Sequence, residues 1–324
     1  MKRRQIIASV GGLIGALPFF AHAQAPRAPG KIGYLHPRTI APDHPTLEAL
    51  RSVWQRLGYV EGETVLLRSA EGDARRLPQQ VDELIALKVG VLIVVGSAAV
   101  RAATQTTRTI PIVAIDLETD PVRAGYARSF ARPGGNVTGL FLDQPSLAGK
   151  WIDLLREAAP GIERLGVLWD PSTGRDQLET AQSVARVKGL EAVVIEHSLA
   201  TDFDETLRRL GSQKRTGIVH LTGPGFVVVA AKFAAAAQKY RMPTISWLKA
   251  YAAAGVMMTY GPIQELYFAR AVSFADRILN GDKPGDLSIE GPDRFELVIN
   301  RKTAKAMGLT IPQTLLLRAD EVIE

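Results

Sequence analysis

The feature that most constrains the fold of this chain is an internal repeat with a spacing of about 132 residues. Four pairs of landmarks share this order: the glycines Gly33 and Gly166, the glycines Gly58 and Gly189, the apolar runs 91–96 and 218–223, and the segments 108–113 and 240–245. Chance matches need not keep one register along a chain. The sequence therefore predicts two halves that are built alike.

Each half alternates short apolar runs with segments of helical periodicity. In the first half we expect strands at residues 31–36, 64–68, 91–95 and 110–115. Between the first two, Leu47, Leu50 and Trp54 recur at helical spacing, and Gly58 ends the helix. Continuous apolar strands that alternate with helices are typical of parallel sheets covered on both faces. The predicted fold class is α/β, with two similar lobes, each a parallel sheet flanked by helices, joined by a multi-strand hinge.

The remaining segments suggest how the two lobes are connected. The glycine-rich segment 134–139 lies between the halves and is predicted to be a crossing strand and hinge. We expect a long helix at 263–279, a strand at 295–300 and a short helix at 302–307. The predicted division is 27–140 plus 262–285 for the first lobe, and 141–261 plus 286–324 for the second.

The N-terminus has the pattern of a secretory signal peptide. Lys2, Arg3 and Arg4 precede an apolar run at 6–20, and Ala21-His22-Ala23 is a small-x-small cleavage signal. The apolar run is shorter than the roughly 20 residues that span a membrane. We predict a signal peptide at 1–23 and a periplasmic protein, exported by either the general or the twin-arginine route. Because the chain has no cysteine, it is not expected to be a lipoprotein.

Charge and motifs argue against two other classes of protein. The net charge of +6 is dispersed, with no basic run interleaved with aromatic residues, so no nucleic-acid partner is expected. The sequence holds no His-Glu-x-x-His pair, G-x-S-x-G elbow, P-loop or G-x-G-x-x-G fingerprint. We therefore predict a binding protein and no enzyme, with no catalytic residue, metal site or cofactor.

A ligand is expected where the carboxyl ends of the strands in the two lobes face each other. Ligands of open parallel α/β sheets bind beyond these ends. The first wall of this cleft would come from residues 36–38, 71–73, 96–98 and 116–121, and the second from 170–174, 196–198, 222–225 and 247. The candidate ligand-binding residues are His36, Gly96, Ser97, Ala98, Asp116, Asp120, Thr138, Asp170, Thr222, Gly223, Trp247 and Tyr260.

Most of these candidates also have a purely structural interpretation. Ser97 opens a helix whose amide groups could hold an anion, or it could simply cap that helix. Asp116 and Asp170 end strands, where they could hold an ammonium group or stabilise a turn. Trp247 could stack on a flat ligand or pack in the core. The sequence leaves these alternatives open.

Several segments together resemble a known family. They are 58–62, 110–113, 120–122, 131–140, 288–292, 295–300, 303–312 and 315–324, and they look like those of the ABC-transporter substrate-binding family that includes the TrpX-type binding proteins. The resemblance covers nearly the whole chain after the signal peptide. Segments 38–45 and 171–175, which should line the cleft, differ from the TrpX-type pattern. That difference leaves the identity of the ligand open.

The resemblance implies a type I periplasmic-binding-protein fold, hinge closure on a ligand, and an importer as partner. TrpX-type members are associated with aromatic amino acids. The predicted function is that of the extracytoplasmic solute-binding component of an ABC importer, a monomer that works with a permease and its ATPase and binds an amino acid or related compound. The competing functions are an exported sensor that docks on a membrane receptor and an exported enzyme. A regulator on the same fold would need a DNA-binding helix-turn-helix where the signal peptide stands.

Overall fold

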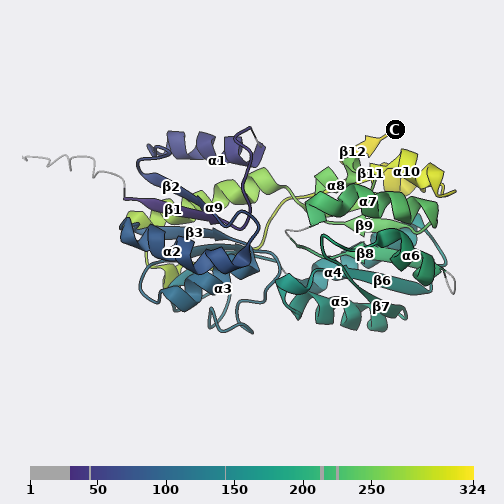
Figure 1. Cartoon of the computed structure of the whole chain (residues 1–324), viewed down its shortest axis with the longest axis horizontal. Coiled ribbons are helices and arrows are strands. Elements are labelled where there is room, and N and C mark those ends of the chain that lie inside the picture. The colour runs from purple at the N-terminus through teal and green to yellow at the C-terminus, as the bar shows by residue number, and fades with distance from the viewer. Residues whose placement is uncertain (1–29, 44, 143, 212–214, 224–225) are drawn as a thin grey trace, which may run out of the picture.

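The computed structural model describes residues 30–324 except 44, 143, 212–214 and 224–225. The predicted signal peptide therefore lies outside the described residues. Two lobes lie side by side along the long axis of the molecule (Figure 1). We define the first lobe by the five-stranded sheet that contains β1, and the second lobe by the seven-stranded sheet that contains β6.

The first lobe is a parallel sheet with helices on both faces. Its strand order is β2-β1-β3-β4-β5, and every neighbouring pair is parallel. The strands are β1 (Ile32–His36), β2 (Val65–Ser69), β3 (Val91–Val95), β4 (Ile112–Asp116) and β5 (Val137–Phe141). The helices are α1 (Pro45–Arg56), α2 (Leu77–Ala86), α3 (Ser97–Thr106) and α9 (Gln264–Leu279), with a 3₁₀ turn η1 (Ala74–Arg76). Helix α9 comes from far along the chain but packs against α1, β3 and β4.

The second lobe repeats this arrangement and then extends it. Its sheet runs β7-β6-β8-β9-β10-β11-β12, so the first five strands follow the same order as those of the first lobe. The strands are β6 (Arg164–Trp169), β7 (Glu191–Glu196), β8 (Thr216–His220), β9 (Thr244–Ser246), β10 (Met258–Pro262), β11 (Phe295–Asn300) and β12 (Glu321–Ile323). The helices are α4 (Gln144–Ala158), α5 (Asp176–Val187), α6 (Phe203–Gly211), α7 (Phe226–Lys239), α8 (Lys249–Ala253), α10 (Arg301–Ala306) and α11 (Gln313–Leu316), with a 3₁₀ turn η2 (Pro171–Thr173). The 3₁₀ turn η3 (Pro284–Asp286) follows α9 and contacts β5 of the first lobe.

The repeat predicted from the sequence corresponds to equivalent positions in the two lobes. Gly33 lies in β1 and Gly166 in β6, and a Cβ on either would approach an apolar side chain to 2.9 Å. Gly58 follows α1 and Gly189 follows α5, in each case the first helix after the first strand of the lobe, and both have positive φ, +80° and +72°. Glycine adopts this left-handed conformation without the steric cost that a Cβ brings. The prediction of two similar α/β lobes is confirmed.

Two details differ from the expected arrangement. The second sheet is not wholly parallel, because β11 pairs with β10 in antiparallel register. The segment predicted to cross at 134–139 instead forms part of β5, which pairs with β4 along its whole length and is buried throughout. Gly139 in β5 has φ +128°, and a Cβ there would lie 2.1 Å from the carbonyl oxygen of Ala114. The close strand contact makes this segment part of the sheet, so the chain crosses only after β5.

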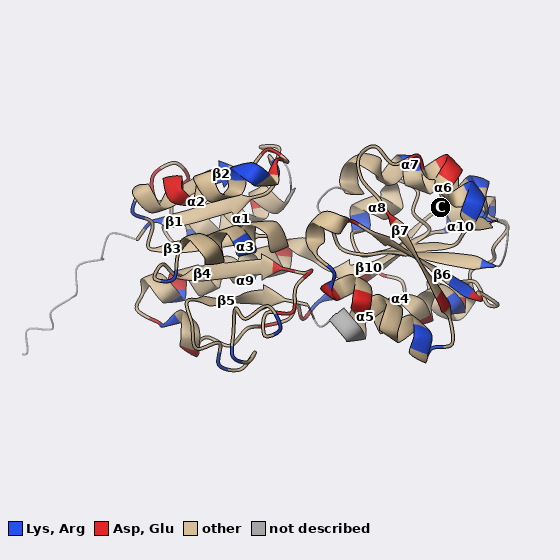
Figure 2. Cartoon of the chain, turned by 60° about the horizontal axis from the view of Figure 1, so that its bottom comes forward, with Lys and Arg blue, Asp and Glu red and all other residues tan. Residues whose placement is uncertain are grey.

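The chain passes between the lobes at three places: after β5, between β10 and α9, and between η3 and β11. Each lobe is consequently built from segments distant in sequence, as the yellow-green α9 within the blue first lobe shows (Figure 1). In the described part of the chain, no helix combines the length and apolar character needed to cross a membrane. Positive and negative residues are interspersed on both lobes (Figure 2).

Candidate functional site

A cavity of about 350 Å³ lies between the lobes, at the carboxyl ends of β1, β3 and β4. Its lining comes from both lobes: His36, Pro37, Arg38, Thr39, Ile40, Ala41, Thr46, Val95, Gly96, Ile115, Leu117, Glu118, Gly223, Val227, Trp247, Leu248, Tyr251, Gln264, Tyr267 and Phe268. We call it the first cavity. Its volume falls within the range of about 300–1,000 Å³ that is usual for small-molecule sites.

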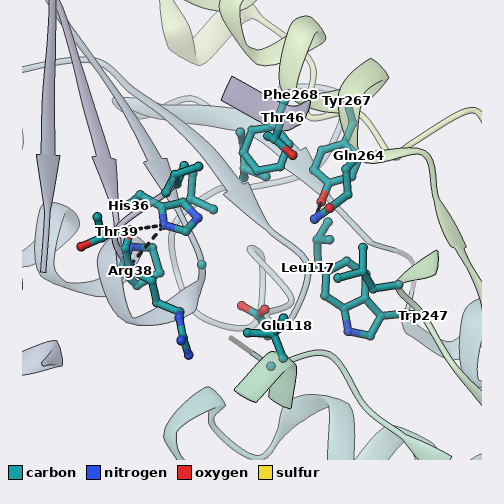
Figure 3. Close-up of a pocket in the computed structure, with 18 of the residues that line it drawn as sticks. His36, Arg38, Thr39, Thr46, Leu117, Glu118, Trp247, Gln264, Tyr267 and Phe268 are labelled. Carbon is teal, nitrogen blue, oxygen red and sulfur yellow. Dashed lines mark hydrogen bonds between the residues drawn. The ribbon is translucent and has the colours of Figure 1, made fainter. Parts of the chain in front are cut away.

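The two lobes line the first cavity with different chemistry. The charged and amide groups come from the first lobe, where Arg38, Glu118 and Gln264 face the space. The second lobe contributes mainly apolar and aromatic side chains, of which Trp247 and Tyr251 are the largest. Figure 3 shows His36 and Arg38 on one side of this space and Trp247 on the other, with Glu118 between them. The cavity can therefore hold a flat apolar group against one wall and a charged group against the other.

Glu118 is the acidic side chain of this lining, and it is only 7% exposed. Its Oε2 accepts a hydrogen bond of 2.9 Å from the backbone N–H of Ser97, at the start of α3. Burial, followed by repulsion from Asp116, raises the pKa of the Glu118 carboxyl to about 8. The carboxyl is therefore easily protonated at neutral pH in the absence of a compensating positive charge.

Asp116 lies behind Glu118, at the end of β4, and is fully buried. Its Oδ1 accepts hydrogen bonds from the backbone N–H groups of Glu118 at 3.0 Å and Thr119 at 3.1 Å. Its Oδ2 has no hydrogen-bond partner within the described residues. Burial raises the pKa of this carboxyl, and the Thr119 side chain together with the two backbone donors opposes that change. Asp116 thus stabilises the turn that presents Glu118 to the cavity.

The aromatic part of the lining is assembled from three separate elements. Trp247 follows β9, Tyr251 lies in α8, and Tyr267 and Phe268 lie in α9. The ring centroids of Trp247 and Tyr251 are 6.2 Å apart at an interplanar angle of 87°. The indole Nε1 of Trp247 is buried and has no hydrogen-bond partner among the described residues. A donor of this kind is satisfied when a ligand supplies an acceptor.

A second cavity, of about 760 Å³, adjoins the first. Pro37, Arg38 and Thr39 line both, so the segment after β1 separates the two spaces. The second cavity is polar and is lined by Pro37, Arg38, Thr39, Glu71, Gly72, Ala74, Ala98, Arg101, Asp170, Ser172, His197, Ser198 and Leu199. Together the two cavities form a cleft bordered by the strand ends of both lobes.

Contacts between the lobes hold this cleft narrow. The Oγ1 of Thr222 lies 2.8 Å from Gln177 Oε1 within the second lobe and 3.3 Å from the carbonyl oxygen of Leu117 in the first. Arg123 of the first lobe reaches α5 of the second, where its guanidinium lies 2.7 Å from Glu179 Oε2 and 3.5 Å from Asp176 Oδ1. These contacts require the lobes to be close together, so the structure represents a closed arrangement.

The twelve candidates from the sequence fall into three groups. Four line the first cavity: His36, Gly96, Gly223 and Trp247. Two line the second: Ala98 and Asp170. The others, Ser97, Asp116, Asp120, Thr138, Thr222 and Tyr260, line neither of these two cavities.

The candidates outside the cavities have structural contacts of their own. Asp120 accepts hydrogen bonds from the backbone N–H groups of Val122 and Arg123, and Thr138 Oγ1 donates to the carbonyl oxygen of Leu287. Asp170, although it lines the second cavity, also accepts from Ser172 N at 2.9 Å. Tyr260 stacks on Phe295 with ring centroids 5.5 Å apart. The backbone N–H of Ser97 donates a hydrogen bond to Glu118 Oε2.

Sequence reasoning did not single out Glu118, Thr46, Tyr251, Gln264, Tyr267 or Phe268. Glu118 lies within the range 116–121 that the sequence placed at a strand end, so its position in the chain indicated that it could line the cleft. The predicted division assigned residues 262–285, and with them Gln264, Tyr267 and Phe268, to the first lobe, but no local pattern shows which side chains of this segment face a cavity. No group of three or more His, Asp or Glu side chains suited to a metal ion occurs in the described ranges.

Comparisons with known proteins agree with this geometry. The family model described as ABC transporter substrate binding protein matches residues 43–323. A tyrosine-binding protein of Clostridioides difficile is 22% identical over 276 residues, which cover 82% of this chain and 79% of that protein.

Solved structures of similar proteins share the fold. A conserved domain protein of Vibrio cholerae has a TM-score of 0.80 at 24% identity, covering 91% of this chain and all of that one. An ABC domain from Streptococcus pneumoniae in complex with L-Trp has a TM-score of 0.79 at 22% identity, with the same coverage. The fold predicted from the sequence, that of type I periplasmic binding proteins, is thereby confirmed.

Proposed function

The chain belongs to the family of ABC transporter substrate-binding proteins, and from this premise we propose that it is the extracytoplasmic solute-binding component of an ABC importer. It captures a small molecule in the first cavity by hinge closure and presents the closed form to a permease with its ATPase. The observation that carries the proposal is the cavity itself, enclosed between two lobes whose strand ends face each other.

Closure follows from the position of the cavity. A ligand in the first cavity contacts Arg38 and Glu118 of one lobe together with Trp247 of the other. Only the closed state offers both sets of contacts, so the ligand shifts the equilibrium between open and closed forms toward the closed form. The Thr222–Leu117 and Arg123–Glu179 contacts add to this state but do not depend on the ligand.

The lining favours a ligand with a flat apolar body and a small polar end. Trp247, Tyr251, Tyr267 and Phe268 supply aromatic surface, while the polar groups gather on one wall. An amino acid with an aromatic side chain, or a compound related to one, fits this division. The relatives named for tyrosine and tryptophan support the same class.

The site of action follows from the predicted signal peptide at residues 1–23. We propose that the mature protein is a periplasmic monomer without a lipid anchor. Its role is binding and delivery, and no chemical step is required of it. These parts of the proposal rest on the sequence and on the family.

A thermal-shift screen of residues 24–324 against amino acids, nucleosides, sugars and organic acids tests the function. A ligand that binds only the native state stabilises it by about 2.7 kcal/mol at a concentration of about 100 times Kd. We expect a dose-dependent rise in Tm for one chemical class. A folded protein that no compound in the library stabilises would contradict the proposed binding function.

A matched pair of variants tests the site. Val227 and Val228 are neighbours in α7 with 52% and 55% exposure, but only Val227 lines the first cavity. We expect Val227→Arg to weaken binding of the compound found in the screen by about 10-fold or more, because the longer side chain enters the cavity mouth. Val228→Arg should bind like the unmodified protein. Equal affinities of the two variants would place the ligand elsewhere.

A further inference from the structure

The start of α3 faces the cleft, and one of its N–H groups is already engaged by a side chain of the protein. Exposed N–H groups at a helix start attract carboxylates and phosphates. Here the N–H of Ser97 donates to Glu118 Oε2 at 2.9 Å, so a side chain of the protein itself engages this donor. A ligand carboxylate placed against Ser97 would therefore meet the Glu118 carboxyl group.

Glu118 remains available to a ligand on its other side. It lines the first cavity, and its carboxylate is held by the backbone of α3 while Asp116 stands behind it. Two buried carboxyl groups this close repel each other when both are ionised, and a positive charge in the cavity relieves that repulsion. The lining provides no lysine, and its one arginine, Arg38, lines the second cavity as well.

On this basis we propose that the first cavity selects ligands that carry a protonated amine, and that Glu118 is the residue that receives this amine. The inference rests on the proposed function and specifies its ligand class: an aromatic body between Trp247 and the α9 aromatics, with an ammonium group at Glu118. A carboxylate on the ligand is then optional and lies away from α3. Glu118 is thereby the residue that favours aromatic amines over purely anionic aromatic compounds.

The groups around Glu118 are consistent with this selection. The charged and titratable side chains that face it are Asp116 from its own segment, His36 and Arg38 from the end of β1, Tyr251 from α8 and Tyr267 from α9. Burial raises the pKa of both tyrosines, so they stay neutral near pH 7. The pKa of Glu118, about 8 without a ligand, falls when an ammonium group pairs with it, and a proton is released.

The test uses two probes that share an indole and differ in their charged end, tryptamine and indole-3-propionate. Isothermal titration calorimetry of residues 24–324 near pH 7 should show tryptamine binding at least about 10-fold tighter. Glu118→Gln, which keeps the size of the side chain, should lower tryptamine affinity by about 10- to 100-fold and abolish the preference. Glu63→Gln makes the same charge change at an exposed site before β2, at the other end of the sheet, and should change neither affinity.

A second measurement on the unmodified protein covers the case in which Glu118→Gln folds poorly. Tryptamine titrations near pH 7 in two buffers of different ionisation enthalpy report protons exchanged on binding. We expect release of close to one proton per tryptamine bound, and none for indole-3-propionate.

Three results would overturn the inference while leaving the proposed function in place. One is equal affinity for the two probes, and another is a Glu118→Gln variant that keeps the preference for tryptamine. The third is a screen in which only non-aromatic or purely anionic compounds stabilise the protein. A screen in which nothing stabilises the folded protein would instead contradict the proposed function itself.

Discussion

The two walls of the first cavity differ more than the repeated fold of the two lobes would suggest. The first lobe brings Arg38, Glu118 and Gln264, whereas the second brings Gly223, Val227, Trp247, Leu248 and Tyr251. The first five strands of the two sheets follow the same order, so the difference lies in the side chains at the strand ends and in the helices that line the cavity. On the proposed function, the first lobe discriminates by charge, while apolar surface comes from both lobes, from Trp247 and Tyr251 of the second and from Tyr267 and Phe268 of the first.

Truncation of Trp247, on the second-lobe side of the cavity, should have the largest effect on ligand affinity. Trp247 is 9% exposed and lines the first cavity, and its buried Nε1 has no hydrogen-bond partner among the described residues. Trp247→Ala removes on the order of 100 Å² of apolar contact with a ligand, which at about 25 cal/mol per Å² corresponds to a loss of about 10- to 100-fold. Calorimetry with tryptamine measures it.

Trp247→Phe serves as the control, because it keeps an aromatic ring and removes the indole N–H. It should retain most of the affinity. If Trp247→Ala binds tryptamine as tightly as the unmodified protein, the second lobe does not cover the ligand, and the proposed division between the walls is wrong.

The ionisation of Glu118, on the first-lobe side of the cavity, should make the stability of the protein depend on pH. Because the folded state raises the pKa of Glu118 from 4.5 to about 8, it keeps a proton that the unfolded chain releases in this range. Stability from this group is full below about pH 4.5 and is lost as the pH rises toward about 8. Glu118→Gln removes the dependence, so its Tm relative to that of the unmodified protein should increase from pH 5 to pH 8.

Thermal unfolding at several pH values measures this difference, at about 2–4 °C for each kcal/mol. The comparison is made without ligand, since an amine bound at Glu118 would lower its pKa and mask the change. A difference in Tm that stays constant over this range would show that Glu118 ionises normally, and would weaken the contrast between the walls.

Loss of the Arg123–Glu179 ion pair between the lobes should have the smallest effect, a change in the balance of open and closed forms. The Arg123 side chain is 57% exposed where it pairs with Glu179, and exposed ion pairs contribute about 0.2–1 kcal/mol. Arg123→Gln should therefore favour the open form by at most about 5-fold, as measured by fluorescence energy transfer between labels on the two lobes. Salt at about 1 M, where the Debye length is about 3 Å, should remove the difference.

A variant of a different basic residue provides the comparison for that experiment. Arg132 is exposed in the first lobe, and Arg132→Gln makes the same charge change. It should leave closure unaltered. A larger effect of Arg123→Gln that persists at high salt would mean that the edge contact, and not the two walls, governs closure.

The sequence by itself determined the architecture of this protein. The repeat of about 132 residues predicted two lobes, and the lobes indeed share one strand order. The strand-end rule placed His36, Gly96, Gly223 and Trp247 at the cleft, where the structure finds them. These features are accessible because strand periodicity, helix ends and parallel topology are encoded locally, and parallel strands end on the same edge of their sheet.

Only the tertiary structure decided which side chains face the cavity. Asp116 and Glu118 are two residues apart, yet one folds back to stabilise the turn and the other lines the cavity. That outcome depends on the geometry of the turn and on the N–H of Ser97, which comes from the start of α3. Likewise the sequence assigned residues 262–285 to the first lobe, but only the packing of α9 against α1, β3 and β4 decides that Gln264, Tyr267 and Phe268 line the cavity. Contacts between segments this distant are set by three-dimensional packing, which no local pattern records.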